Sequence, residues 1–68
     1  MTLTEKFQRN LKRIRVAKGM SQHKLAIVSG YTVSYISGLE CGTRAGPLST
    51  VEAFAKALGL RDPLELLR

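Results

Sequence analysis

The sequence predicts a single all-helical domain that spans residues 1–68. Four of its six glycines stand where helices are expected to end, and each is followed by a residue that commonly caps the next helix. No stretch alternates apolar and polar residues for long enough to indicate a strand. The hydrophobic content of 44% is sufficient for a core. The five expected helices lie near 3–18, 22–28, 33–41, 50–58 and 63–67.

The first two helices are indicated by an apolar stripe and by the residues between them. Phe7, Leu11 and Ile14 recur at the three- and four-residue spacing of one helix face. Gly19 is expected to end the first helix, because glycine adopts the left-handed conformation there without a clash at Cβ. Ser21 is the expected N-cap of the second helix.

The second and third helices are short, and a tight turn separates them. Gly30 is expected to end the second helix, and Thr32 is the expected N-cap of the third. Two short helices joined in this way are typical of a helix-turn-helix, whose second helix enters the major groove of DNA. The pattern therefore raises a nucleic-acid hypothesis that other features of the sequence test.

The outward face of the third helix is expected to carry small side chains. A rotation of about 100° per residue turns Ile36 and Leu39 toward the core. The opposite face comprises Ser34, Ser37, Gly38 and Cys41, with Val33 between the two faces. A helix that only solubilises a surface usually carries Lys and Glu, whereas small residues let the helix axis approach another surface closely. This face favours a helix that docks into a groove.

The last two helices are indicated by their starting residues. The segment before the fourth helix contains glycine and proline and is a loop by composition. Ser49 is followed three residues later by Glu52, which is the capping-box pattern. Asp62 and Glu65 repeat this spacing, and Pro63 suits the first position of the last helix.

Glu40 falls on the inward side of the third helix. A buried carboxylate without a partner is costly, and Arg15, beside the apolar stripe of the first helix, is the expected partner. The alternative is a Glu40 side chain that is solvated at the edge of its helix.

Positive charge is concentrated in the first two-thirds of the chain. Residues 1–44 contain eight Lys or Arg and two acidic residues, whereas residues 45–68 contain three of each. The entire net charge of +6 therefore lies in the part that holds the two-helix motif. This asymmetry suits a polyanionic partner, and ordinary solvated side chains are the alternative explanation.

The residues that catalysis or metal binding needs are scarce. His23 is the only histidine and Cys41 the only cysteine, so neither has the companions of a zinc site. The glycines form no phosphate-binding motif. We therefore expect a non-enzyme without metal, cofactor or small-molecule ligand. No apolar run is long enough to span a bilayer and no signal-peptide pattern opens the chain, so a cytoplasmic protein without membrane contact is expected.

Three segments have a more specific spacing than a generic two-helix motif. They are residues 11–26, 30–44 and 54–59, and the second contains Tyr35-Ile36-Ser37-Gly38-Leu39-Glu40. Together they resemble the XRE family of λ repressor- and Cro-like regulators over about residues 7–67. The hexapeptide is also similar to small controller proteins of restriction–modification systems.

The resemblance implies a compact five-helix λ-repressor-like fold and a homodimer that binds a two-fold symmetric operator in double-stranded DNA to regulate transcription. The residues expected to face base edges are Thr32, Val33, Ser34, Ser37 and Gly38. Those expected to contact the DNA backbone are Gln22, Lys24, Tyr35, Thr43 and Arg44. Arg15 and Glu40 match the structural ion pair of the family.

This chain departs from the family on the base-reading face. Many relatives place Gln, Arg or Asn there, and those side chains can bond one base bidentately. Val33, Ser34 and Gly38 offer no such group. We therefore expect this helix to discriminate less at each base step.

Leu60, Leu64 and Leu67 form an apolar stripe near the C-terminus. The stripe either closes the core of the monomer or forms a two-fold contact, and we favour a homodimer. The leading hypothesis is thus a dimeric transcriptional regulator. The alternatives are a protein-interaction module and an antitoxin-type, partner-binding protein. A steep loss of affinity with salt would distinguish DNA binding from an apolar protein contact.

Overall fold

Four α-helices and one short 3-10 helix make up the chain. The structure is a computed structural model, describes all 68 residues and contains no strand. The elements are α1 (Leu3–Ala17), α2 (Gln22–Ser29), α3 (Val33–Cys41), α4 (Leu48–Ala57) and the 3-10 helix η1 (Pro63–Leu66). The prediction of an all-helical fold is confirmed.

The expected fifth α-helix is instead the single 3-10 turn η1, so the prediction of five α-helices is wrong. This element has four residues, and its main chain is held by the bonds from Glu65 N to Asp62 O and from Leu67 N to Leu64 O. Both bonds span three residues, because so short a segment closes 3-10 turns more readily than α-turns. Asp62 is its N-cap, as expected, and its side chain accepts from Leu64 N.

The α2 and α3 boundaries follow the capping residues read from the sequence. The side chain of Ser21 accepts from Lys24 N, and that of Thr32 accepts from Tyr35 N. Gly30 ends α2 with a φ of 81°, which is the left-handed conformation that glycine adopts without strain. The turn between these helices is therefore defined by local chemistry.

The start of α4 differs from the sequence prediction. The helix begins at Leu48 after Pro47, and Ser49 lies inside the first turn instead of capping it. The ring of Pro47 fixes φ at a value compatible with this position, and its carbonyl accepts from Thr50 N and Val51 N. The expected Ser49 cap is therefore wrong, because proline sets the boundary two residues earlier.

The start of α1 is fixed by a capping box that was not predicted. Thr2 N donates to Glu5 Oε1 at 2.9 Å, and Glu5 N donates to Thr2 Oγ1 at 3.1 Å. The backbone N–H of Thr2 stabilises the carboxylate and lowers the pKa of Glu5 below its ordinary value. The spacing of Thr2 and Glu5 is the same signal that indicates the later caps.

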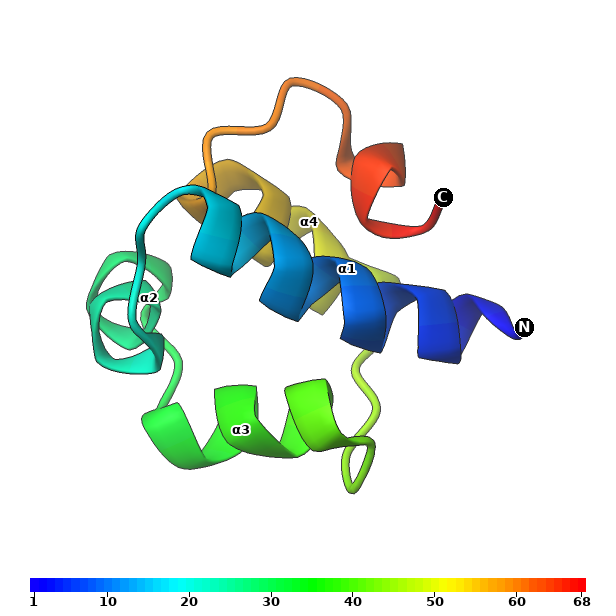
Figure 1. Cartoon of the computed structure of the whole chain (residues 1–68), viewed down its shortest axis with the longest axis horizontal. Coiled ribbons are helices and arrows are strands. Elements are labelled where there is room, and N and C mark those ends of the chain that lie inside the picture. The colour runs from blue at the N-terminus through cyan, green and yellow to red at the C-terminus, as the bar shows by residue number, and fades with distance from the viewer.

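Eleven buried apolar residues form one core between the helices. Figure 1 shows α1 crossing the middle of the molecule, α3 on one side of it and η1 on the other. The side chains of Leu11, Leu25, Leu39, Phe54 and Leu66 are fully buried, so each of the five elements contributes to this core. None of the helices combines the length and apolar character that a membrane crossing requires.

A buried ion pair joins α1 to α3. Arg15 Nε donates to Glu40 Oε2 at 2.7 Å, and a second guanidinium nitrogen donates to Oε1 at 3.0 Å. Arg15 Nη1 also donates to the carbonyl oxygen of Met20, just before α2. The two side chains are only 10% and 5% exposed. The expected pair is therefore present as a bidentate, nearly water-free contact.

We expect Glu40→Gln to lower the free energy of unfolding by about 3–5 kcal/mol, because it leaves a buried guanidinium without its counter-charge. Chemical denaturation monitored by circular dichroism measures this change. The exposed Arg68–Asp62 pair provides the matched control, since Asp62→Asn removes a carboxylate of an ion pair that is 66% and 44% exposed. Equal stability of Glu40→Gln and the parent protein would contradict a structural role for the pair.

Candidate nucleic-acid interface

The helix-turn-helix presents the N-terminal part of α3 to solvent. Thr32, Val33 and Ser34 are exposed, and Ser37 is half-buried one turn further along. The Thr32 hydroxyl accepts the capping bond from Tyr35 N, so its own hydrogen is free to be donated outward. These four residues keep the accessible positions that a reading face needs.

Gly38 is not part of this exposed face. It is buried, and a Cβ atom built on it would lie 2.9 Å from Cγ of Arg44 and 3.0 Å from its Cδ. The helical periodicity of α3 alone predicts an outward position for Gly38. The loop after the helix folds back and covers this position, so the prediction of an exposed, base-facing Gly38 is wrong.

Arg44 lies across α3 in a defined place. Its backbone N–H donates to the carbonyl oxygen of Gly38 at 3.1 Å, and its aliphatic carbons rest on that glycine. Its guanidinium carbon lies 5.8 Å from the centre of the Tyr35 ring, which is a cation–π distance. The absence of a side chain at Gly38 thus seats Arg44 beside the exposed end of α3.

Tyr35 is the platform beneath this arginine. Its ring stacks on Tyr31 with centroids 5.1 Å apart, and Tyr31 stacks in turn on the buried Phe54 at 5.1 Å. Its hydroxyl lies 3.5 Å from Oγ1 of Thr50. The stack through Tyr31 to Phe54 therefore fixes the ring of Tyr35 against the core. The phosphate contact expected of its hydroxyl stays a prediction.

Gly46 makes room for the Tyr35 hydroxyl, and this contribution was not predicted. A Cβ atom at Gly46 would lie 2.9 Å from Oη of Tyr35 and 3.0 Å from Cβ of Thr50. The only sequence signal was the glycine before Pro47 in the loop, which does not identify the ring it accommodates. A shallow hollow beside this cluster is lined by Gly30, Tyr31, Thr32, Tyr35 and Arg44.

Gln22 connects the buried ion pair to the surface. Its Nε2 donates to Glu40 Oε1 at 3.1 Å, which uses one of the two amide hydrogens. The second hydrogen is available at the N-terminus of α2, where a helix favours anions. Lys24 is exposed in the same turn. The Gln22–Glu40 bond was missed because the sequence does not show which atoms converge.

Cys41 and Thr43 close the C-terminal end of α3. The Thr43 hydroxyl lies 3.5 Å from Sγ of Cys41, and this contact lowers the pKa of the exposed thiol below its ordinary value. The Thr43 hydroxyl can donate its single hydrogen either to this sulfur or to the carbonyl oxygen of Gly38, which is also 3.5 Å away. Thr43 therefore supports the turn that returns Arg44 to the helix. No group of three or more metal-ligating side chains is present.

The three C-terminal leucines do not lie in one stripe. Leu64 is 56% exposed and Leu67 is half-buried, and both line an apolar hollow with Leu48 and Val51 of α4. Leu60 lines a separate hollow with Arg13, Ile14, Glu65 and Arg68. The structure therefore brings Leu64 and Leu67 together and leaves Leu60 apart.

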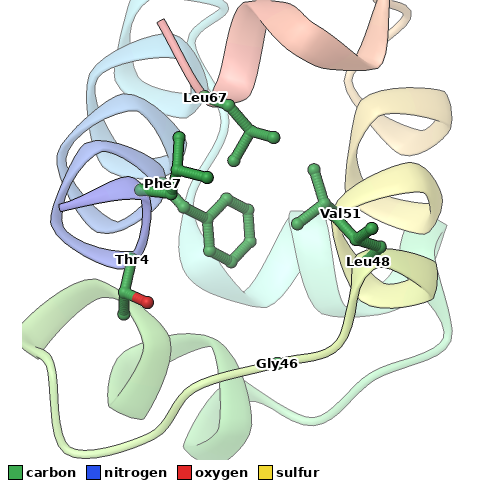
Figure 2. Close-up of a pocket in the computed structure, with 7 residues that line it drawn as sticks. Thr4, Phe7, Gly46, Leu48, Val51 and Leu67 are labelled. Carbon is green, nitrogen blue, oxygen red and sulfur yellow. The ribbon is translucent and has the colours of Figure 1, made fainter.

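A neighbouring pocket extends this apolar surface to α1. Figure 2 shows the side chains of Phe7, Leu48, Val51 and Leu67 around a pocket between α1, α4 and the C-terminal segment. Leu3 and Leu48 at its edge are 63% and 70% exposed. Large apolar side chains that remain exposed together are typical of a protein contact surface.

Residues 7–67 match the model of a family described as a helix-turn-helix domain. The chain is 42% identical over 62 residues to control protein C.BamHI of Bacillus amyloliquefaciens, which covers 90% of this chain and 75% of that protein. It is also similar to the structure of the restriction-modification controller protein C.AhdI from Aeromonas hydrophila, with 41% identity, a TM-score of 0.85 and coverage of 93% and 94%. The structure of C.Esp1396I bound to a 25 base pair operator site has 34% identity, a TM-score of 0.86 and coverage of 96% and 86%.

We expect Gly38→Ala to displace Arg44 while leaving α3 folded. Alanine is the better helix former by about 1 kcal/mol, but its Cβ would overlap Cγ of Arg44. Proton NMR measures the displacement, because side-chain protons above the Tyr35 ring experience its ring current and lose that shift when they move away. Ser37→Ala is the matched control on the same helix. Unchanged chemical shifts of the Arg44 side chain in Gly38→Ala would contradict its packing on Gly38.

Proposed function

This chain belongs to the helix-turn-helix domain family, and we propose that it is a sequence-specific DNA-binding transcriptional regulator of the restriction–modification controller type. The observation that carries the proposal is the exposed end of α3 beside a seated Arg44, in a fold that a relative uses while bound to an operator. Such a role requires no catalysis and no cofactor, and we place the protein in the cytoplasm.

Charge supports a nucleic-acid partner over a protein one. The net charge of +6 falls within residues 1–44, which contain both helices of the motif. A duplex attracts such a surface through its phosphates, and binding releases counterions. A protein-interaction module that used the small residues of α3 would gain little from this charge.

The proposed contacts divide into base readers and backbone contacts. The proposed readers are the exposed Thr32, Val33 and Ser34 and the half-buried Ser37. They offer hydroxyl groups and a branched apolar side chain for thymine methyls. The backbone contacts are Gln22, Lys24, Tyr35, Thr43 and Arg44. In this arrangement Gln22 donates its free amide hydrogen to a phosphate while Glu40 fixes the other.

The active form that we propose is a homodimer. Leu64 and Leu67 of the C-terminal segment, with Leu48 and Val51 of α4, provide an apolar surface that a second copy of the chain would cover. Leu60 is no longer included, because it lines a different hollow. Two subunits related by a two-fold axis would place two copies of α3 in successive major grooves.

The first test is the salt dependence of Arg44→Ala. Its guanidinium lies beside the reading face on a loop, where we propose that it contacts a phosphate. The variant should weaken binding to all sequences similarly and lower the slope of log affinity against log salt by about one. Arg61→Ala, which removes an exposed arginine from the loop between α4 and η1, is the control and should retain the slope.

A changed base preference at one operator position in Arg44→Ala would show instead that Arg44 reads a base. Binding that is insensitive to salt in the parent protein would overturn the DNA proposal itself and favour a protein partner.

The second test concerns the operator. Without a bidentate reader, which is worth roughly 1–3 kcal/mol per base pair, α3 alone should discriminate weakly. We expect in vitro selection to return a two-fold symmetric site with half-sites about one helical turn apart. Its central base pairs should affect affinity without being contacted, because easily deformed DNA lets both subunits dock.

Systematic substitution of the central steps measures this effect, with the half-sites held fixed. A flat response there, with one dominant half-site base, would show that direct contacts suffice.

A further inference from the structure

Asn10 is a buried polar residue that the proposed DNA contacts do not use. It lies on α1 and is only 2% exposed. Its Nδ2 donates to the carbonyl oxygen of Leu66 at 3.2 Å and to that of Arg68 at 3.0 Å. Arg13 donates to its Oδ1 at 3.2 Å. The amide is thus fully oriented, with both hydrogens directed at a segment more than fifty residues away in the sequence.

The segment held by Asn10 has little internal support. The turn η1 has only four residues, and the bonds at its two ends run from Glu65 N to Asp62 O and from Leu67 N to Leu64 O. The carbonyl groups at the end of any helix lack partners within it, and an isolated single turn is unstable in water. Asn10 supplies one donor to Leu66 at the end of the turn and a second to the main-chain oxygen of Arg68 two residues further on, and so acts as a C-terminal cap provided by α1.

The same turn presents the proposed contact surface. Leu66 points inward and is fully buried, whereas Leu64 is 56% exposed and Leu67 borders the hollow shared with α4. Figure 1 shows this turn lying beside α1, with no further element outside it. The placement of the two outer leucines therefore depends on how the turn is fixed to α1.

We propose that Asn10 is the positioning residue for the self-association surface, an inference that rests on the proposed homodimer. Its two hydrogen bonds fix η1 so that Leu64 and Leu67 form one apolar surface with α4. Loss of these bonds frees the turn and weakens self-association, although Asn10 is buried and touches no partner.

The test uses the full chain with Asn10→Asp. The substitution keeps the size of the side chain and the acceptor for Arg13, but places a carboxylate oxygen against two carbonyl oxygens. We expect the amide protons of Glu65 and Leu67 to exchange as in an unfolded segment, while those of α1 and α4 stay protected. The dissociation constant of the dimer, from sedimentation equilibrium, should rise at least about tenfold, which corresponds to 1.4 kcal/mol.

Two control variants distinguish the effect of the Asn10 hydrogen bonds on η1 from the effect of the apolar surface on self-association. They also distinguish both effects from the proposed function. Arg13→Ala removes the other partner of Asn10 and keeps both donated bonds, so exchange and self-association should stay within about twofold of the parent, a difference well below 1.4 kcal/mol. Leu64→Ser should weaken self-association and leave the exchange of η1 unchanged in the monomer. Unimpaired self-association of Leu64→Ser would overturn the proposed dimer surface.

If the η1 amides stay protected from exchange in Asn10→Asp, the proposal that the Asn10 hydrogen bonds fix this turn is wrong. Faster exchange with an unchanged dissociation constant would show that Asn10 does not position the surface. If Asn10→Asp fails to fold, Asn10→Ser is measured in the same way. Serine introduces no buried charge, and its shorter side chain cannot reach the main-chain oxygen of Arg68.

Discussion

The bidentate contact between Arg15 and Glu40 is the constraint on which the orientation of the helix-turn-helix depends. Apolar burial holds helices together without specifying a direction, whereas two parallel hydrogen bonds between a guanidinium and a carboxylate allow one geometry. Arg15 also binds the carbonyl of Met20, and Glu40 also accepts from Gln22. A single buried network therefore fixes α3 against α1 and ties both helices to the start of α2.

In a chain of 68 residues, the same few helices have to form the core and provide the exposed surface. On α3, Ile36 and Leu39 are buried while Ser34 on the opposite face is exposed. In η1, Leu66 fills the core while Leu64 stays exposed. Both elements thus contribute to the core on one side and remain exposed on the other. Changes that loosen the core are expected to affect recognition as well.

The predictable part of this fold is the part that local chemistry decides. Ser21 and Thr32 cap their helices by accepting hydrogen bonds from residues three positions ahead, so the sequence spacing predicts where each helix begins. Asp62 did so as well, although the element it begins is a single 3-10 turn. Ser49 was misassigned because the rigid ring of Pro47 began α4 earlier.

The candidate site was less predictable because distant segments complete it. The inward side of Glu40 and its pairing with Arg15 followed from helical periodicity and from the cost of a lone buried charge. The burial of Gly38 could not be predicted from helical periodicity, because it results from a loop that folds back over the helix. The donors that Asn10 directs at the C-terminal turn are likewise invisible in the sequence, because 56 residues separate the partners.

The position of the Arg44 side chain on Gly38 couples residue 38 to residue 44. A long amide or guanidinium at position 38 could bond a base directly, but its Cβ would occupy the space that the Arg44 side chain fills. Any side chain at position 38 therefore moves the Arg44 side chain away from its present place on the helix. An engineer who grafts a new reader onto position 38 would therefore have to redesign the loop at the same time, because the new side chain would displace the arginine at position 44.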